Sequence, residues 1–159
     1  MATLKMRKNR QVALLRGVGL FSGCTNAELA HIASLTTEYH AKPGQVLAER
    51  GKPGSEFFVV VDGEATATRN GVLLSTLGPG SFFGELALLD GGSRTATVVA
   101  KTDMQLLVLS RREFRTLQEL SPSVQNKMLV ELGRRLRRMD DRLDSSPALN
   151  VDIAEWSLL

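Results

Sequence analysis

Residues 56–77 read EFFVVVDGEATATRNGVLLSTL, and this stretch decides the class of fold. It contains three short runs of strand-forming residues, which are Glu56–Val61, Glu64–Arg69 and Val72–Leu77. Only Asn70 and Gly71 separate the last two runs, and a type I′ hairpin turn requires positive φ at both of its central residues. Because Asn and Gly tolerate that geometry best, the stretch predicts short antiparallel strands joined by a tight turn.

The same texture of short strands and turn residues continues on both sides, from about Tyr39 to Ser110. Further candidate strands are Gln45–Glu49, Thr95–Ala100 and Gln105–Leu109. Many short strands at this spacing indicate a closed or nearly closed antiparallel barrel. We therefore expect a mainly β protein with flanking helices, whose centre is an antiparallel β-barrel of the jelly-roll (double-stranded β-helix) type.

Helical patterns flank the predicted barrel on both sides. A capping box at Thr25–Glu28 and another at Ser110–Glu113 each mark the start of a helix. Ser121-Pro122 then restarts the chain as a long C-terminal helix, because Ser caps a helix and Pro suits its first position. The expected divisions are an N-terminal helical segment (1–38), the barrel (39–110), the C-terminal helices of the same domain (111–144) and a tail (145–159).

The composition excludes several classes of protein. The chain has 159 residues, and its net charge of +3 is too small to indicate nucleic acid by itself. Cys24 is the single cysteine, which excludes an intrachain disulfide and makes the cytoplasm the expected compartment. His31 and His40 are too few for a metal triad, so we expect no metal and no enzyme activity. No run approaches the roughly 18 apolar residues of a spanning helix, so no membrane partner is expected.

The stretch with the most distinctive chemistry is residues 80–98, GSFFGELALLDGGSRTATV. Gly84 permits a close approach of the backbone to a ligand, and the turn of helix that follows offers free amides to an anion. Arg94 can place two parallel donors on a phosphate. A carboxylate at Glu85 would be repelled by that phosphate unless it accepted hydrogen bonds from sugar hydroxyls. Phosphate and sugar together indicate a nucleotide.

These residues resemble a known family. Phe83–Leu88, followed at a short distance by Arg94–Thr97, is similar to the phosphate-binding cassette of cyclic nucleotide-binding domains. Such domains occur in the bacterial cAMP receptor protein, in protein kinase regulatory subunits and in cyclic nucleotide-gated channels. Val46–Gly51, Phe57–Val60 and Asp62–Glu64 also resemble the barrel of the family. The resemblance covers roughly Leu20 to Asp144.

The resemblance implies a role for each residue of the cassette. Glu85 accepts a hydrogen bond from the ribose 2′-hydroxyl, with help from the Gly84 amide, while Arg94 and the Ala87 amide hold the phosphate oxygens. Thr95 contacts the phosphate or the purine edge, and its hydroxyl suits cAMP while also being able to reach a guanine amino group. The ligand-binding residues expected are Phe83, Gly84, Glu85, Leu86, Ala87, Arg94, Thr95 and Ala96, with base contacts from Arg135, Met139 and Trp156.

The long C-terminal helix suggests partners. Apolar residues recur along it with a two-in-seven spacing, at Leu129, Leu132, Leu136, Met139 and Leu143. A narrow apolar seam of this kind favours a second helix, and the resemblance points to a parallel homodimer. Five arginines lie within Arg134–Arg142, and a nucleic-acid-binding regulator would use them, but Glu131, Asp140 and Asp141 offset their charge. About fifteen residues follow Asp144, too few for a helix-turn-helix, so direct DNA binding is not expected.

We therefore interpret the chain as a stand-alone cyclic nucleotide-binding regulatory module, with cAMP preferred to cGMP as the ligand. Binding is expected to shift the C-terminal helix and so to signal to an effector protein that the sequence does not identify. One alternative is an interaction module of the same fold whose pocket stays empty, in which Glu85 and Arg94 form a plain ion pair that braces a loop. A metal-dependent barrel enzyme is a weaker alternative, because the metal ligands are missing.

Overall fold

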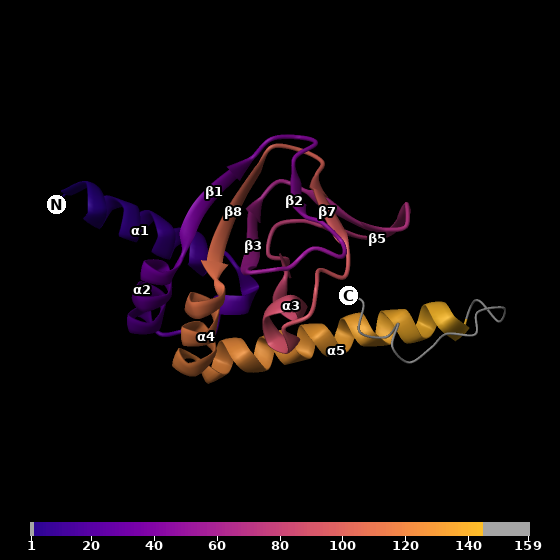
Figure 1. Ribbon diagram of the computed structural model, residues 1–159. Helices are drawn as coiled ribbons and strands as arrows, with labels where there is room; N and C mark the ends of the chain where they lie inside the picture. Colours follow the sequence, from indigo (N-terminus) through magenta and orange to yellow (C-terminus); the bar gives the residue numbers. More distant parts are fainter. Residues whose placement is uncertain (1, 145–159) are drawn as a thin grey trace.

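The computed structural model describes residues 2–144, with the side chains of residues 8–142 (Figure 1). The helices are α1 (Ala2–Arg16), the short 3-10 helix η1 (Gly19–Phe21), α2 (Asn26–Leu35), α3 (Glu85–Asp90), α4 (Arg111–Leu120) and α5 (Pro122–Asp144). The strands are β1 (Thr37–Ala41), β2 (Val46–Ala48), β3 (Glu56–Asp62), β4 (Ala65–Arg69), β5 (Val72–Leu77), β6 (Phe82–Phe83), β7 (Thr97–Ala100) and β8 (Met104–Ser110).

The strands form two antiparallel sheets of four strands each. One sheet has the order β1-β8-β3-β6, and the other has the order β2-β7-β4-β5. All the pairings are antiparallel, and they join segments that lie far apart in the sequence, as in the pairing of β4 with β7. The predicted mainly β fold, a jelly roll with N-terminal helices and a long C-terminal helix, is confirmed.

Strand β3 has two buried faces, and the alternation of its side chains separates two apolar clusters. Phe57 and Val59 pack with residues of the helices, including Phe114 of α4, whose ring centroid lies 4.8 Å from that of Phe57. Phe58 and Val60 point to the other side, into the interior between the sheets. Because successive residues of a strand face opposite sides, one continuous apolar run serves both clusters.

The two capping boxes and the Asn-Gly turn predicted from the sequence are present in the structure. In both capping boxes the Ser or Thr hydroxyl accepts from the backbone N–H three residues on, and the Glu carboxylate accepts from the backbone N–H of the capping residue. Asn70 and Gly71 have φ values of 50° and 76°, as a type I′ turn requires. The chain therefore reverses between β4 and β5 at the predicted position.

Two strands are absent from the sequence prediction, and three predicted strands are shorter than expected, those over Gln45–Glu49, Glu64–Arg69 and Thr95–Ala100. β1 (Thr37–Ala41) has a mostly exposed pattern without apolar alternation, and it forms because it pairs with β8. β6 (Phe82–Phe83) has only two residues and is held by β3. The strand expected over Thr95–Ala100 begins at Thr97, which leaves Thr95 and Ala96 in the loop after Arg94.

The long helix α5 passes close to α3 and extends beyond it (Figure 1). This arrangement brings the C-terminal helix to the segment that interrupts the strands. The predicted tail, residues 145–159, lies outside the described residues, and Trp156 lies within it. Among residues 2–144, no helix is both long enough and apolar enough to cross a membrane.

Candidate functional site

A cavity of about 270 Å³ lies between α3, the sheet that contains β4 and β5, and helix α5. Its wall includes seven of the eight residues predicted for ligand binding, which are Phe83, Gly84, Glu85, Leu86, Ala87, Thr95 and Ala96. The predicted site residues are therefore brought together around one space, with the exception of Arg94.

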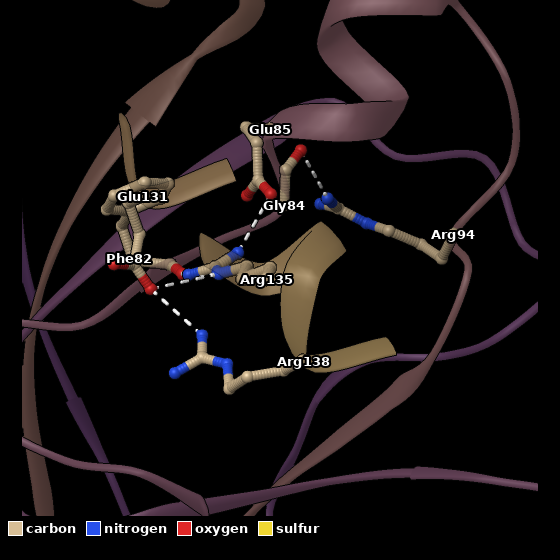
Figure 2. Close-up of polar contacts among 7 residues, drawn as sticks. All are labelled: Phe82, Gly84, Glu85, Arg94, Glu131, Arg135 and Arg138. Carbon is tan, nitrogen blue, oxygen red and sulfur yellow. Dashed lines mark hydrogen bonds and ion pairs between the residues drawn. The ribbon is translucent and has the colours of Figure 1, made fainter. Parts of the chain in front are cut away.

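Glu85 is the buried charge of this cavity. The residue is 1% exposed, and its Oε1 accepts a hydrogen bond of 2.9 Å from Arg135 Nη1 (Figure 2). Its other carboxylate oxygen, Oε2, is buried without a hydrogen-bond partner among the described residues. Burial raises the pKa of the Glu85 carboxyl above its ordinary value, and the positive charge of Arg135 opposes that rise. One oxygen of a buried carboxylate is thus left for a donor from outside the chain.

Arg135 reaches this carboxylate from α5, across fifty positions of sequence. Its Nη2 also donates to the carbonyl oxygen of Phe82 at 2.6 Å, and its guanidinium lies 4.6 Å from the centre of the Phe82 ring. Glu131, one turn earlier on α5, lies 3.4 Å from Arg135 Nε. The guanidinium therefore joins α5 by hydrogen bonds to the first residue of α3 and to β6.

Arg94 lies directly behind Gly84 and does not line the cavity. It is 8% exposed, and its Nη1 donates to the carbonyl of Gly84 at 3.1 Å (Figure 2). Its Nη2 donates to the carbonyl of Glu56 at 2.9 Å. Burial lowers the pKa of the Arg94 guanidinium from its ordinary high value. The sequence interpretation placed Arg94 in the cavity itself, whereas here two backbone carbonyls hold it one residue away.

Gly84 separates Arg94 from the cavity, and only glycine fits there. Its φ of +92° lies in the left-handed region, and a Cβ atom at this position would lie 2.6 Å from Arg94 Nη1 and 2.7 Å from the Glu56 carbonyl oxygen. The close approach predicted for Gly84 is therefore an approach to Arg94. Glu85 and Arg94 do not form the ion pair that was considered as an alternative. Glu85 pairs with Arg135, and Arg94 donates to two backbone carbonyls.

The three predicted base contacts have different outcomes. Arg135 lines the cavity, Met139 is not part of the cavity wall, and Trp156 lies outside the described residues. Sequence reasoning missed a further group of wall residues on β5 and α5, which are Leu74, Ser75, Thr76, Leu77, Glu131 and Arg142. The three- and four-residue spacing of Arg135, Arg138 and Arg142 is a signal that places them on one face of a helix.

The jelly roll and this cavity, with a buried acid and arginines beside a short helix, define a class of small-ligand-binding domain. The model of the cyclic nucleotide-binding domain family matches residues 38–120, just over half of the chain. This chain belongs to the cyclic nucleotide-binding domain family. Such a domain is itself non-catalytic.

Several relatives of known identity are similar to this chain. A cyclic AMP receptor protein of Thermus thermophilus is 33% identical over 135 residues, which are 82% of this chain and 62% of that protein. A cyclic nucleotide-gated potassium channel of Mesorhizobium japonicum is 39% identical over 116 residues, 72% of this chain and 32% of the channel. The chain thus spans less than two thirds of the length of either relative.

A solved structure shares the fold. The regulatory domain of Toxoplasma gondii PKA, crystallised with cAMP, superposes with a TM-score of 0.73 and covers 82% of this chain and 51% of that chain. At 24% identity, this likeness concerns the fold alone.

Proposed function

We propose that this chain binds a cyclic nucleotide in the cavity beside α3, and that it acts as a regulatory module. The observation that carries the proposal is Glu85 Oε2, a buried carboxylate oxygen without a hydrogen-bond partner in the described part of the chain. A buried acceptor without a donor costs roughly 1–3 kcal/mol, so a ligand hydroxyl that reaches it offsets that cost. The ribose 2′-hydroxyl of a nucleotide is such a donor.

The phosphate takes the position beside Gly84 and Ala87, next to the guanidinium of Arg94. Both Nη atoms of Arg94 donate to backbone carbonyls, which are weaker acceptors than a charged phosphate oxygen. A phosphate therefore competes with these carbonyls for a guanidinium that already lies beside the site. The Ala87 amide is the second phosphate contact that the family resemblance implies.

The purine contacts Thr95 and the α5 wall of the cavity, and we propose cAMP as the preferred ligand. The name of the Thermus relative, a cyclic AMP receptor protein, supports this choice. The Thr95 hydroxyl lies at the cavity and is the group that would favour a guanine amino group instead.

Helix α5 carries the signal to an effector protein. Arg135 joins this helix to the Glu85 carboxylate, so a sugar hydroxyl that donates to Oε2 weakens the attraction between that carboxylate and Arg135. A ligand with different affinities for two positions of α5 shifts the population between them. Arg138 and Arg142 also lie at the cavity, so the same movement changes the exposed basic surface of α5.

The exposed apolar side chains of α5 support a homodimer. Leu129 is 62% exposed and Leu136 is 44% exposed, and the two are seven residues apart on one face of the helix. Leu132 of the predicted seam packs instead against the core of this chain. We propose that the face with Leu129 and Leu136 packs against the same face of a second copy. Sedimentation tests this: the protein should sediment as a dimer and Leu129→Glu as a monomer, whereas a monomeric wild-type protein contradicts the proposal.

Calorimetric titration with cAMP, cGMP and 5′-AMP tests the ligand. Saturable binding of cAMP at lower concentration than cGMP, with 5′-AMP weaker than both, is the expected result. Absence of heat and of a thermal shift at millimolar cyclic nucleotide would overturn the proposal and favour an interaction module with an empty cavity. Salt-sensitive retention of DNA or RNA would instead indicate that the arginines of α5 bind nucleic acid. The cytoplasmic location inferred from the single cysteine stays a prediction.

A further inference from the structure

We propose that Arg111, the first residue of α4, is a positioning residue for Arg94 and acts on it through the loop between β2 and β3. The inference rests on the proposed function, because Arg94 is the group that meets the phosphate. Arg111 lies in neither the cavity wall nor the cassette. Its effect on a ligand therefore has to pass through the loop, residues 49–55.

Two hydrogen bonds join the loop to the backbone N–H and carbonyl of Arg94 itself. The Gly51 N–H donates to the Arg94 carbonyl at 2.9 Å, and the Arg94 N–H donates to the Lys52 carbonyl at 2.8 Å. Pro53 and Ser93 form an isolated antiparallel bridge beside these bonds. The main chain of Arg94 consequently follows the position of the loop.

At Gly54 the backbone of the same loop comes close to the Arg94 side chain. A Cβ atom on Gly54 would lie 2.5 Å from Arg94 Nε, 2.7 Å from its Cζ and 2.8 Å from the Cβ of Ala87. Real Cβ atoms do not approach this closely, so the Gly54 backbone is already in contact with both the guanidinium and the cassette. Any displacement of Gly54 therefore changes the space in which the guanidinium lies.

Arg111 of α4 forms a side-chain hydrogen bond with the backbone of Gly54. Its Nη2 donates to the Gly54 carbonyl at 3.0 Å, across 57 positions of sequence. Two residues further along, the Glu56 carbonyl accepts from Arg94 Nη2. The segment 54–56 is thus held by two arginines, one from α4 and one from the cassette. The capping box of Ser110 and Glu113 fixes the start of α4, so Arg111 approaches the loop from an ordered helix terminus.

This arrangement assigns the loop a function in ligand affinity. The donors of Arg94 can meet a phosphate only if the guanidinium remains between Gly54 and Gly84. Loss of the Arg111 bond frees the Gly54 carbonyl, widens the range of positions open to the loop, and adds an ordering cost to phosphate binding. Arg111 thereby links the start of the C-terminal helices to the phosphate site by a route separate from Arg135.

The test compares substitutions at two adjacent arginines of the full chain. Arg111→Ala should weaken cAMP binding about tenfold, as expected for loss of one hydrogen bond from a charged donor. Arg111→Lys should recover part of this loss, because an ammonium can still donate to the Gly54 carbonyl. Arg112→Ala is the matched control, since Arg112 is exposed on the same turn and donates to no atom of the loop, and its affinity should stay within about twofold.

A second comparison separates positioning from general stability. In an Arg94→Lys background, which retains a cation without the paired donors, Arg111→Ala should produce little further loss of cAMP affinity. Gly54→Ala should weaken binding in the same way as Arg111→Ala, whereas Gly78→Ala, where an added Cβ meets no atom within 4 Å, should not. This pair also keeps the test decisive if Arg111→Ala does not fold.

The outcomes distinguish this inference from the proposed function. If wild-type protein binds no cyclic nucleotide, the proposed function fails. If wild-type protein binds cAMP and Arg111→Ala binds it equally well, the positioning role is overturned while the proposed function stands. An undiminished Arg111→Ala effect in the Arg94→Lys background would likewise overturn it, because the effect would not pass through Arg94.

Discussion

Two regions beside strand pair β3–β6 are held by opposite kinds of interaction. Toward the helices, Phe57 and Phe82 pack with Phe114 in an apolar layer. The centroid of the Phe57 ring lies 5.7 Å from that of Phe82 and 4.8 Å from that of Phe114. Beside the cavity, the chain is held by Glu85, Arg94 and Arg135, each of them wholly or largely buried. The apolar layer contains no buried charge, whereas the charged region leaves one carboxylate oxygen without a hydrogen-bond partner among residues 2–144.

This difference shows which region stabilises the fold and which retains the capacity to bind. Apolar burial is favourable and non-directional, so the helical layer contributes stability without needing any further partner. Buried charges require partners, and a set of charges that is incomplete lowers stability until a ligand completes it. Substitutions in the first region should therefore change folding, and substitutions in the second should change affinity.

Phe114→Ala should give the largest effect on the apolar layer. Phe114 is 2% exposed and packs on Phe57, so its truncation leaves a cavity and should lower the free energy of unfolding by about 3–5 kcal/mol. Urea denaturation measures this loss. The cAMP affinity of the protein that remains folded should change by less than about threefold, because Phe114 is not part of the cavity wall. A large loss of affinity at unchanged stability would contradict the separation of the two regions.

Arg94→Ala should lower cAMP affinity strongly and the free energy of unfolding only moderately. Removing the guanidinium takes two charged donors from the phosphate, so cAMP affinity should fall by about a hundredfold, or about 3 kcal/mol. Two backbone carbonyls also lose their donor, and the free energy of unfolding should decrease by about 1–2 kcal/mol. Calorimetry and urea denaturation of the same sample measure both quantities. Binding equal to that of the wild-type protein would show that the phosphate does not use Arg94.

Glu85 should contribute through the sugar hydroxyl alone. The wild-type protein should bind cAMP about tenfold more tightly than 2′-deoxy-cAMP, because only cAMP donates to the orphaned Oε2 atom. In Glu85→Ala this difference between the two ligands should disappear, and calorimetric titration of both proteins with both ligands measures it. If the difference survives in Glu85→Ala, the hydroxyl has another acceptor and the role of Glu85 is wrong.

The helix starts and the β4–β5 hairpin were predictable because their signals are local. A capping box spans four residues and an Asn-Gly turn spans two, so each is complete within a short window of sequence. β1 was missed because its polar sequence, Thr37–Ala41, becomes a strand only through β8, more than sixty residues away. Propensity does not predict strands that pairing alone creates.

Most residues that the sequence predicted for the site lie in the cavity wall, but the sequence did not predict the hydrogen-bond partners of Glu85 and Arg94. The Phe83–Ala87 segment forms one wall, and its residues are close together because they are consecutive in sequence. The partner of Glu85 was missed because Arg135 lies on another helix, and its position depends on how α5 crosses α3. The carbonyl partners of Arg94 were missed because backbone acceptors have no sequence signature.

The pH dependence of binding should give the smallest effect, and it reports directly on the charged region. Burial raises the pKa of Glu85, so its carboxyl takes up a proton at a higher pH than an exposed glutamate does. Since the hydroxyl of the ligand donates best to an ionised carboxylate, cAMP affinity should fall as the pH falls through the folded-state pKa. The contribution of Glu85 to fold stability has the opposite sign: it is fully present below the ordinary pKa of glutamate and is lost as the pH rises through the raised folded-state pKa.

Arg135→Ala sharpens this last prediction, because Arg135 supplies the positive charge that opposes protonation of Glu85. Without that charge, the midpoint of the affinity loss should move to higher pH. Arg137→Ala should leave the midpoint unchanged, since Arg137 is exposed and is not part of the cavity wall. Titrations with cAMP from mildly acidic to neutral pH measure the midpoint in each variant. An identical midpoint in wild type and Arg135→Ala would mean that Arg135 does not act on the carboxylate in solution. The coupling of α5 to the ligand would then have to run through another contact.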